Sequence, residues 1–374
     1  MAFLFGRGKQ VIPPPSGEHA IGTMRFDVKA RARIVAVQAW YPARPTTEPA
    51  EPYLDDVVRA ALADFTRVPK FLLPQNPSYS RVNAPAVSGR FPVLLFNHGF
   101  GSFQKQSSSL MEELASHGFV VLSVGHPGES LVVQFSDGSS VRHDAKHPAW
   151  VAITAGLKAL EQNLREVEPL LAEARNAKDL AGFTVAMTGV AAHRSYAVLL
   201  PLITQWCDDT KAVLDQLAST PLGAVVDASR VGAFGHSLGG MVAGRLAMTD
   251  ERVRAGMNFD GAQLLDGEAT TLPVPFCFLY ADTSTSGRAT VRTEGMNDAL
   301  LGAGGIGAVL RGSMHLNFTD MNNLSMMARA LGSIDRGEMA RVLRATTVGF
   351  FEHHLKGKPL SGFTPSATLV VTKG

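Results

Sequence analysis

The stretch Val231-Gly-Ala-Phe-Gly-His-Ser-Leu-Gly-Gly240 runs from an apolar segment through a tight glycine-rich turn into a helical pattern, which we expect from about Leu238 to Met248. A serine in such a turn takes strained backbone, so its neighbours two positions away must be small, as Gly235 and Gly239 are. The stretch therefore predicts a nucleophile elbow, with Ser237 as the catalytic nucleophile. A chance strand-glycine-helix turn is the alternative that other features have to exclude.

A second feature lies upstream, where the apolar run Phe91–Phe96 leads into the loop His98-Gly-Phe-Gly101. Its two glycines let backbone amides approach a substrate closely. The amides of Phe100 and Leu238 are therefore the candidates for an oxyanion hole. His98 is better explained as a ring that shapes this loop by hydrogen bonding than as a base.

The candidate base is His315, because it alone among eleven histidines follows the elbow at the end of a late apolar strand. Two carboxylates lie between serine and histidine. Asp260 closes the strand after the elbow, and Asp282 closes the strand after that. Either one can orient a histidine, and strand position slightly favours Asp282. The chain order of serine, acid and histidine is typical of an α/β-hydrolase.

The chain resembles the platelet-activating factor acetylhydrolase family, meaning the plasma and type II intracellular enzymes and their bacterial relatives, across most of residues 30 to 356. The matching stretches are Trp40-Tyr-Pro42, Asn97-His-Gly-Phe-Gly-Ser-Phe103, Leu114-Ala-Ser-His-Gly-Phe-Val120, Gly235-His-Ser-Leu-Gly-Gly240, Phe259-Asp260 and Gly312-Ser-Met-His-Leu-Asn-Phe318.

This resemblance implies an acid at Asp260 and a base at His315, and it leaves Asp282 as a surface or loop-capping carboxylate. It places the oxyanion hole at Phe100 and Leu238, where relatives often carry Leu and Phe in the reverse arrangement. It also implies an ester substrate with a short or oxidised acyl group on a phospholipid-like alcohol.

Composition is consistent with one large α/β domain over residues 1–374, with a mostly parallel central sheet flanked by helices and insertions at about 44–90 and 126–195. The formal net charge of +2, from 35 basic and 33 acidic residues, favours neither a nucleic-acid partner nor a polybasic membrane anchor. Two cysteines, Cys207 and Cys277, lie in segments that read as helix and buried strand, which argues against a disulfide framework.

Several segments outside the motifs have readable patterns. We expect helices at about 54–65, 107–117, 150–176, 195–218, 322–331 and 334–356, and a small hairpin over 134–144. The insertion at about 126–195, which precedes the elbow, is expected to cover the active site. The glycine-rich run 302–307 precedes a strand, whereas a dinucleotide-binding loop follows one, so we expect no such cofactor. No clustered ligand spacing indicates a metal.

No stretch approaches the roughly 18 uninterrupted apolar residues of a transmembrane helix. The apolar run near the N-terminus is too short for a secretory signal, so a cytoplasmic location is the default expectation unless a leader has been trimmed. The sequence leaves the oligomeric state open.

Together the motifs predict a serine hydrolase that cleaves small-molecule carboxylic esters through an acyl-enzyme, and the resemblance implies lipid-like esters. Short acyl chains are expected, because Phe100 is bulky and the 126–195 insertion should close the acyl side of the site. The alternatives are a polyester or cutinase-like hydrolase, which needs a shallower cleft, and an acyltransferase with the same triad. A catalytically silent binding module is disfavoured, since both serine and histidine are present.

Overall fold

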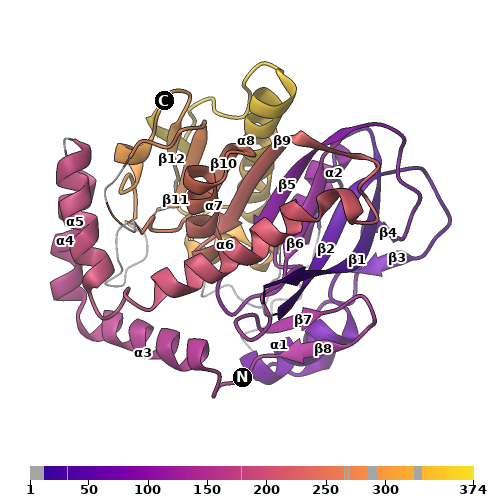
Figure 1. Cartoon of the computed structure of the whole chain (residues 1–374), viewed down its shortest axis with the longest axis horizontal. Coiled ribbons are helices and arrows are strands. Elements are labelled where there is room, and N and C mark those ends of the chain that lie inside the picture. The colour runs from indigo at the N-terminus through magenta and orange to yellow at the C-terminus, as the bar shows by residue number, and fades with distance from the viewer. Residues whose placement is uncertain are drawn as a thin grey trace.

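The computed structural model describes residues 12–31, 33–177, 179–264, 267, 270–282, 284, 293–323 and 331–374. Figure 1 shows the chain with its central sheet and the helices around it. The methionine-bearing helix expected at about 322–331 lies mostly outside the described residues.

The central sheet has eleven strands in the order β13-β12-β11-β10-β9-β5-β6-β2-β1-β4-β3. The strands are β1 (Ala20–Ala30), β2 (Arg33–Ala43), β3 (Ala50–Pro52), β4 (Pro77–Val82), β5 (Phe91–Asn97), β6 (Val120–Val124), β9 (Val226–His236), β10 (Val253–Phe259), β11 (Phe276–Ala281), β12 (Ile306–Leu310) and β13 (Leu369–Lys373). The run from β12 to β6 is parallel, whereas β13 and β2 pair antiparallel at its two ends. The predicted mostly parallel sheet is therefore confirmed.

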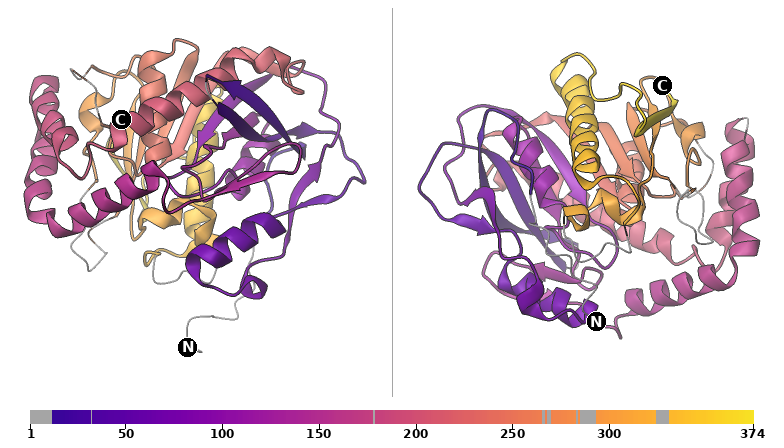
Figure 2. Two further views of the ribbon diagram at one scale, coloured as in Figure 1. Left: turned by 60° about the horizontal axis from the view of Figure 1, so that its bottom comes forward. Right: turned by 180° about the vertical axis from the view of Figure 1, so that it is seen from behind.

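Helices cover both faces of the sheet. The helices are α1 (Asp56–Thr66), α2 (Ser108–Ser116), α3 (Pro148–Gln162), α4 (Leu164–Asn176), α5 (Leu180–Ala192), α6 (Leu199–Asp215), α7 (Leu238–Thr249) and α8 (Arg336–Lys356). Apolar side chains of α6 and α7 pack in the core on one face, and those of α2 and α8 pack in the core on the other. Figure 2 shows α8 on the face opposite α6 and α7. This layering is the α/β-hydrolase arrangement.

The segment before the elbow differs from its sequence prediction in two respects. The helix expected at about 150–176 is divided at Asn163 into α3 and α4, and α5 is an additional helix. Helix α5 lies in a segment for which no helix is expected, and α6 begins at Leu199 rather than at about 195. Glycine, threonine and valine give α5 weak intrinsic helix propensity. Its side chains Phe183, Met187 and Val190 are nevertheless buried, and Asp179 caps the Gly182 amide at 2.8 Å. Tertiary packing therefore overrides local propensity here. The predicted hairpin is present as β7 (Val132–Gln134) paired with β8 (Ser140–Arg142).

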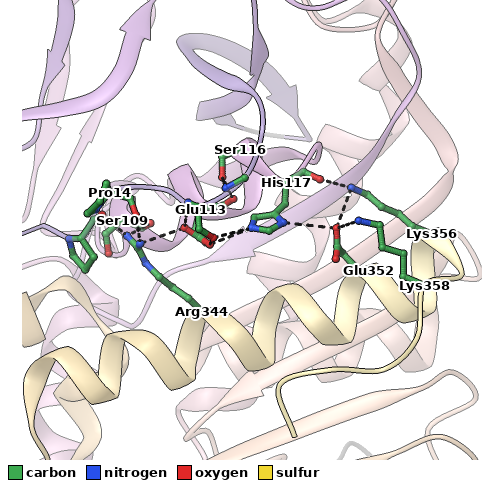
Figure 3. A network of polar contacts seen from close by, with 12 residues as sticks. Pro14, Ser109, Glu113, Ser116, His117, Arg344, Glu352, Lys356 and Lys358 are labelled. Atoms are coloured by element: carbon green, nitrogen blue, oxygen red, sulfur yellow. Dashed lines mark hydrogen bonds and ion pairs between the residues drawn. The ribbon is translucent and has the colours of Figure 1, made fainter.

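A polar network ties α2 to α8 on one face of the sheet, as Figure 3 shows. Arg344 of α8 donates to a Glu113 oxygen of α2 at 3.2 Å and also to the main-chain carbonyls of Pro13 and Pro14. Glu113 also accepts from the amide of Ser16 at 3.0 Å. One buried arginine–glutamate pair thus fixes the segment that precedes β1 against both helices.

The elbow has the strained geometry that its sequence predicts. Ser237, between β9 and α7, has φ 57° and ψ −121°, a region that side-chain-bearing residues rarely adopt. A Cβ added at Gly235 would lie 2.3 Å from the Gly239 backbone, and one added at Gly239 would lie 1.9 Å from the Asn97 carbonyl oxygen. The residues two positions before and two positions after the serine must therefore be glycine.

Candidate active site

The candidate catalytic residues follow parallel strands of one sheet, at the edge where the carboxyl ends of these strands meet. Ser237 follows β9, Asp260 follows β10, and His315 begins the short 3₁₀ helix η5 (His315–Phe318) after β12. Carboxyl ends of parallel strands are the usual place for a site in such sheets. The order of the strands therefore brings residues 237 and 315, which are 78 positions apart in the sequence, to the same edge of the sheet.

Asp260 and His315 are in direct contact. The Nδ1 atom of His315 lies 2.7 Å from Oδ2 of Asp260, and the carboxylate is buried while the imidazole is about half exposed. Oδ1 of Asp260 accepts from the Ala281 amide at 3.0 Å and from the Thr293 hydroxyl at 2.9 Å. These three contacts hold the carboxylate in place, and His315 lines the same cavity as Ser237.

Asp282 has different partners. Its carboxylate accepts from the Gly312 amide at 2.8 Å and from the Ser284 amide at 3.2 Å, and Arg311 lies 3.8 Å away. It is buried rather than on the surface, and its contacts cap the turn that leads toward His315. The structure therefore brings the histidine to Asp260 and gives Asp282 the loop-capping contacts expected from the resemblance.

The loop that carries Phe100 is held against the elbow. The Gly99 amide donates to the Gln106 side chain at 2.9 Å, and the Gly101 amide donates to the Glu129 carbonyl at 3.1 Å. Within the described part of the chain, neither the Phe100 amide nor the Leu238 amide donates a hydrogen bond to the protein. Both are therefore available to a ligand oxygen, and Leu238 is also the first residue of α7, where the helix dipole favours negative charge.

Three buried histidines support these loops. Nδ1 of His98 lies 2.7 Å from the Gly99 carbonyl and Nε2 lies 2.9 Å from the Ser130 hydroxyl, so His98 shapes the oxyanion loop as expected. His236 precedes the serine, and its Nε2 lies 3.0 Å from the main-chain carbonyl of His315. The base is thus attached to the elbow through its own backbone.

The third buried histidine, His126, belongs to a network that the sequence does not reveal. Its ring stacks on Trp206 with centroids 3.8 Å apart, its Nδ1 lies 2.8 Å from Asp209, and its Nε2 lies 3.0 Å from Oδ1 of Asn97. Asp209 also accepts from Arg33 at 3.0 Å. Asn97 ends β5 just before the oxyanion loop, so this network braces the loop from behind. The only local signal in the sequence is that His126 directly follows the mostly apolar segment 119–125.

We expect these histidines to make the fold sensitive to acid. Burial lowers the pKa of His98 to about 3 and lowers the pKa of His126 and His236 from the usual 6.5. Below pH 6.5 the unfolded chain therefore binds more protons than the folded chain. The stability is complete above pH 6.5 and falls as pH drops toward the folded pKa, by at most about 1 kcal/mol per pH unit for each histidine.

Urea unfolding between pH 8 and pH 5 measures this slope. A His98→Asn variant should reduce the slope of the unfolding free energy against pH by about the contribution of one histidine. A free energy of unfolding that stays level or rises between pH 7 and pH 5 contradicts the expectation.

A cavity of about 560 Å³ opens on the serine and the histidine. Besides Ser237, His236 and His315, its described lining comprises residues of the oxyanion loop, of α1, of the 126–195 insertion and of the segment after His315: Leu62, Phe65, Thr66, Gly99, Phe100, Gly101, Ser102, Phe103, Gln106, Leu131, His143, Ala145, Trp150, Ile153, Thr154, Leu316, Thr319 and Met321. Residues 131–154 of the insertion before the elbow thus contribute part of the cavity lining. Sequence reasoning did not single out Phe65, His143 or Trp150, because nothing local marks them.

Other features bear on the class of site. Among the described residues, no group of three or more His, Cys, Asp or Glu side chains is arranged to hold a metal ion. No helix in the described ranges is both long enough and apolar enough to cross a membrane. Cys207 and Cys277 are both buried and free.

Comparisons with known proteins agree with this fold. Residues 5–177 match the family described as "Platelet-activating factor acetylhydrolase, isoform II". The chain is 24% identical to platelet-activating factor acetylhydrolase of Cavia porcellus over 73% of its own length and 60% of the relative's. It is 22% identical to the protein of that name from Gallus gallus over 93% of its length and 84% of the relative's.

Among solved structures, a ferulic acid esterase from Streptomyces cinnamoneus superposes with a TM-score of 0.72 at 22% identity, over 97% of this chain and 99% of that one. The chain spans about three fifths of the length of the Cavia porcellus relative and a similar share of the Bos taurus relative. The fold is that of an α/β-hydrolase, and in sequence the chain is similar to the platelet-activating factor acetylhydrolases.

Proposed function

We propose that the protein is a carboxylic ester hydrolase that works through an acyl-enzyme on Ser237. The observation that carries the proposal is the 2.7 Å contact between Asp260 and His315 beside a strained serine that lines the same cavity. Serine, histidine and carboxylate in this arrangement are the parts that acyl transfer requires. The names of the relatives point the same way, since each is an esterase or an acetylhydrolase.

The mechanism follows from the contacts. The Ser237 hydroxyl attacks the ester carbonyl carbon while its proton passes to Nε2 of His315. Asp260 accepts a hydrogen bond from the Nδ1–H group of His315 and, while remaining ionised, stabilises the imidazolium. The amides of Phe100 and Leu238 donate to the oxyanion of the tetrahedral intermediate. Collapse of the intermediate expels the alkoxide, which takes the proton from His315, and water then attacks the acyl-enzyme by the same route.

The volume of about 560 Å³ belongs to the whole cavity and does not measure its acyl side. The sequence argument for short acyl groups rests on a closed acyl side, which this volume does not test. We therefore propose the reaction class without a limit on acyl length.

Labelling with a fluorophosphonate tests the proposal directly. The probe should attach to a single tryptic peptide and modify Ser237, and His315→Gln should slow the labelling strongly because the serine loses its base. Absence of both labelling and ester hydrolysis contradicts an enzyme of this class. Added methanol separates the acyltransferase alternative, because a transferase forms methyl ester in preference to free acid.

A further inference from the structure

One wall of the cavity is built from aromatic rings that come from distant segments. Trp150 of α3 lies 4.9 Å from Phe100 of the oxyanion loop and 4.6 Å from His143 after β8, measured between ring centroids. Phe65 of α1 lies 6.0 Å from Trp150 and 5.7 Å from His143. We call these four residues the aromatic wall. All four line the cavity, and α1, β8 and α3 gather at one end of the molecule (Figure 1).

The aromatic wall lies directly against the oxyanion loop. A Cβ added at Gly101 would lie only 2.8 Å from Cη2 of Trp150, so the ring packs on the loop backbone without a gap. The cavity beside the histidine has a different lining, formed by Leu316, Thr319 and Met321. The two sides of the cavity therefore differ in their chemistry.

This difference indicates which side of the cavity receives the alcohol portion of the ester and which side receives the acyl portion. The leaving oxygen must lie within hydrogen-bond reach of His315, because the histidine returns the proton to it. The alcohol portion consequently lies on the Leu316 side. The acyl portion then extends along the oxyanion loop, which brings it to the aromatic wall.

The wall also defines which acyl groups fit. Ring pairs prefer edge-to-face and tilted arrangements, and the existing pairs in the wall have interplanar angles of 52° to 84°. Half of the surface of Phe65 is exposed and can receive another ring. The lining residues in the described ranges include no Asp, Glu, Lys or Arg side chain, so histidines are the only ionisable side chains there that a buried charge would meet.

Resting on the proposed function, we infer that the acyl site is built for an uncharged group that carries an aromatic ring. Ethyl phenylacetate and ethyl cyclohexylacetate form a matched pair, since ring size and carbonyl spacing are the same. After each kcat/KM is divided by the rate of hydroxide hydrolysis, the phenyl ester should be preferred about 3- to 10-fold. Benzyl acetate and cyclohexylmethyl acetate place the ring on the alcohol side and should show no comparable preference.

Two variants test whether the aromatic wall causes the preference for the phenyl ester over the cyclohexyl ester. Trp150→Leu and Phe65→Leu should each bring the phenyl-to-cyclohexyl ratio of kcat/KM toward one, whatever change each makes in the rate with the two esters separately. Val151→Ala is the matched control, because Val151 neighbours Trp150 on α3, is 55% exposed and does not line the cavity. Phe65 is half exposed, so its replacement tests the idea even if the tryptophan variant does not fold.

The outcomes separate this inference from the proposed function. A ratio near one in the wild-type protein, or a ratio that neither variant changes, overturns the aromatic acyl site while ester hydrolysis and Ser237 labelling persist. A preference confined to the benzyl acetate pair also overturns it, because the ring then binds on the alcohol side. Loss of all hydrolysis and labelling in the wild type refutes the function itself.

Discussion

Ser237→Ala is expected to lower kcat for nitrophenyl acetate by about a million-fold and to leave the fold intact. The loss is this large because the hydroxyl is the atom that becomes acylated, and neither oxyanion stabilisation nor binding replaces it. The backbone strain at φ 57° is the same for alanine as for serine, so the thermal midpoint should change little. Initial rates with a sensitive fluorogenic ester, together with circular dichroism melting, measure both quantities.

The exposed Ser219 at the end of the segment after α6 provides the matched control. Ser219→Ala should keep wild-type kcat, since this residue does not line the cavity. Activity of Ser237→Ala within about tenfold of wild type means that another residue is the nucleophile, and the proposed mechanism is then wrong.

Asp260→Asn is expected to lower kcat by about four orders of magnitude. The carboxylate accepts a hydrogen bond from Nδ1–H of His315 at 2.7 Å, whereas an amide at the same position can donate to Nδ1 and so favours the wrong tautomer. The amide oxygen can still accept from the Ala281 amide, so the substitution preserves size and one of the supporting contacts. Steady-state kinetics against pH measure the loss.

Asp282→Asn is the matched comparison, because it removes the charge from the other buried carboxylate that follows a neighbouring strand. We expect a kcat close to wild type and some loss of thermal stability, since this carboxylate accepts from Gly312 and Ser284. If Asp282→Asn lost activity and Asp260→Asn kept it, the later strand would supply the acid.

Residues close together in the sequence made the elbow and the main helices predictable. Gly235 and Gly239 flank the serine, and the clash that any Cβ would make there is a local steric fact. Helices α1, α2, α7 and α8 each begin within about two residues of their expected starts, because hydrophobic periodicity is also local. The mostly parallel sheet followed from the alternation of apolar strands and helices.

Contacts between distant residues were decided only by the tertiary structure. The Asp260 carboxylate meets His315 across 55 positions, and His126 meets Asp209 across 83. Nothing in the local pattern distinguishes Asp260 from Asp282, since each closes an apolar strand, and the pairing depends on how η5 lies over β10. Helix α5 and the aromatic wall depend in the same way on packing between segments whose own sequences favour no particular partner, so the shape of the acyl site emerges only when the chain has folded.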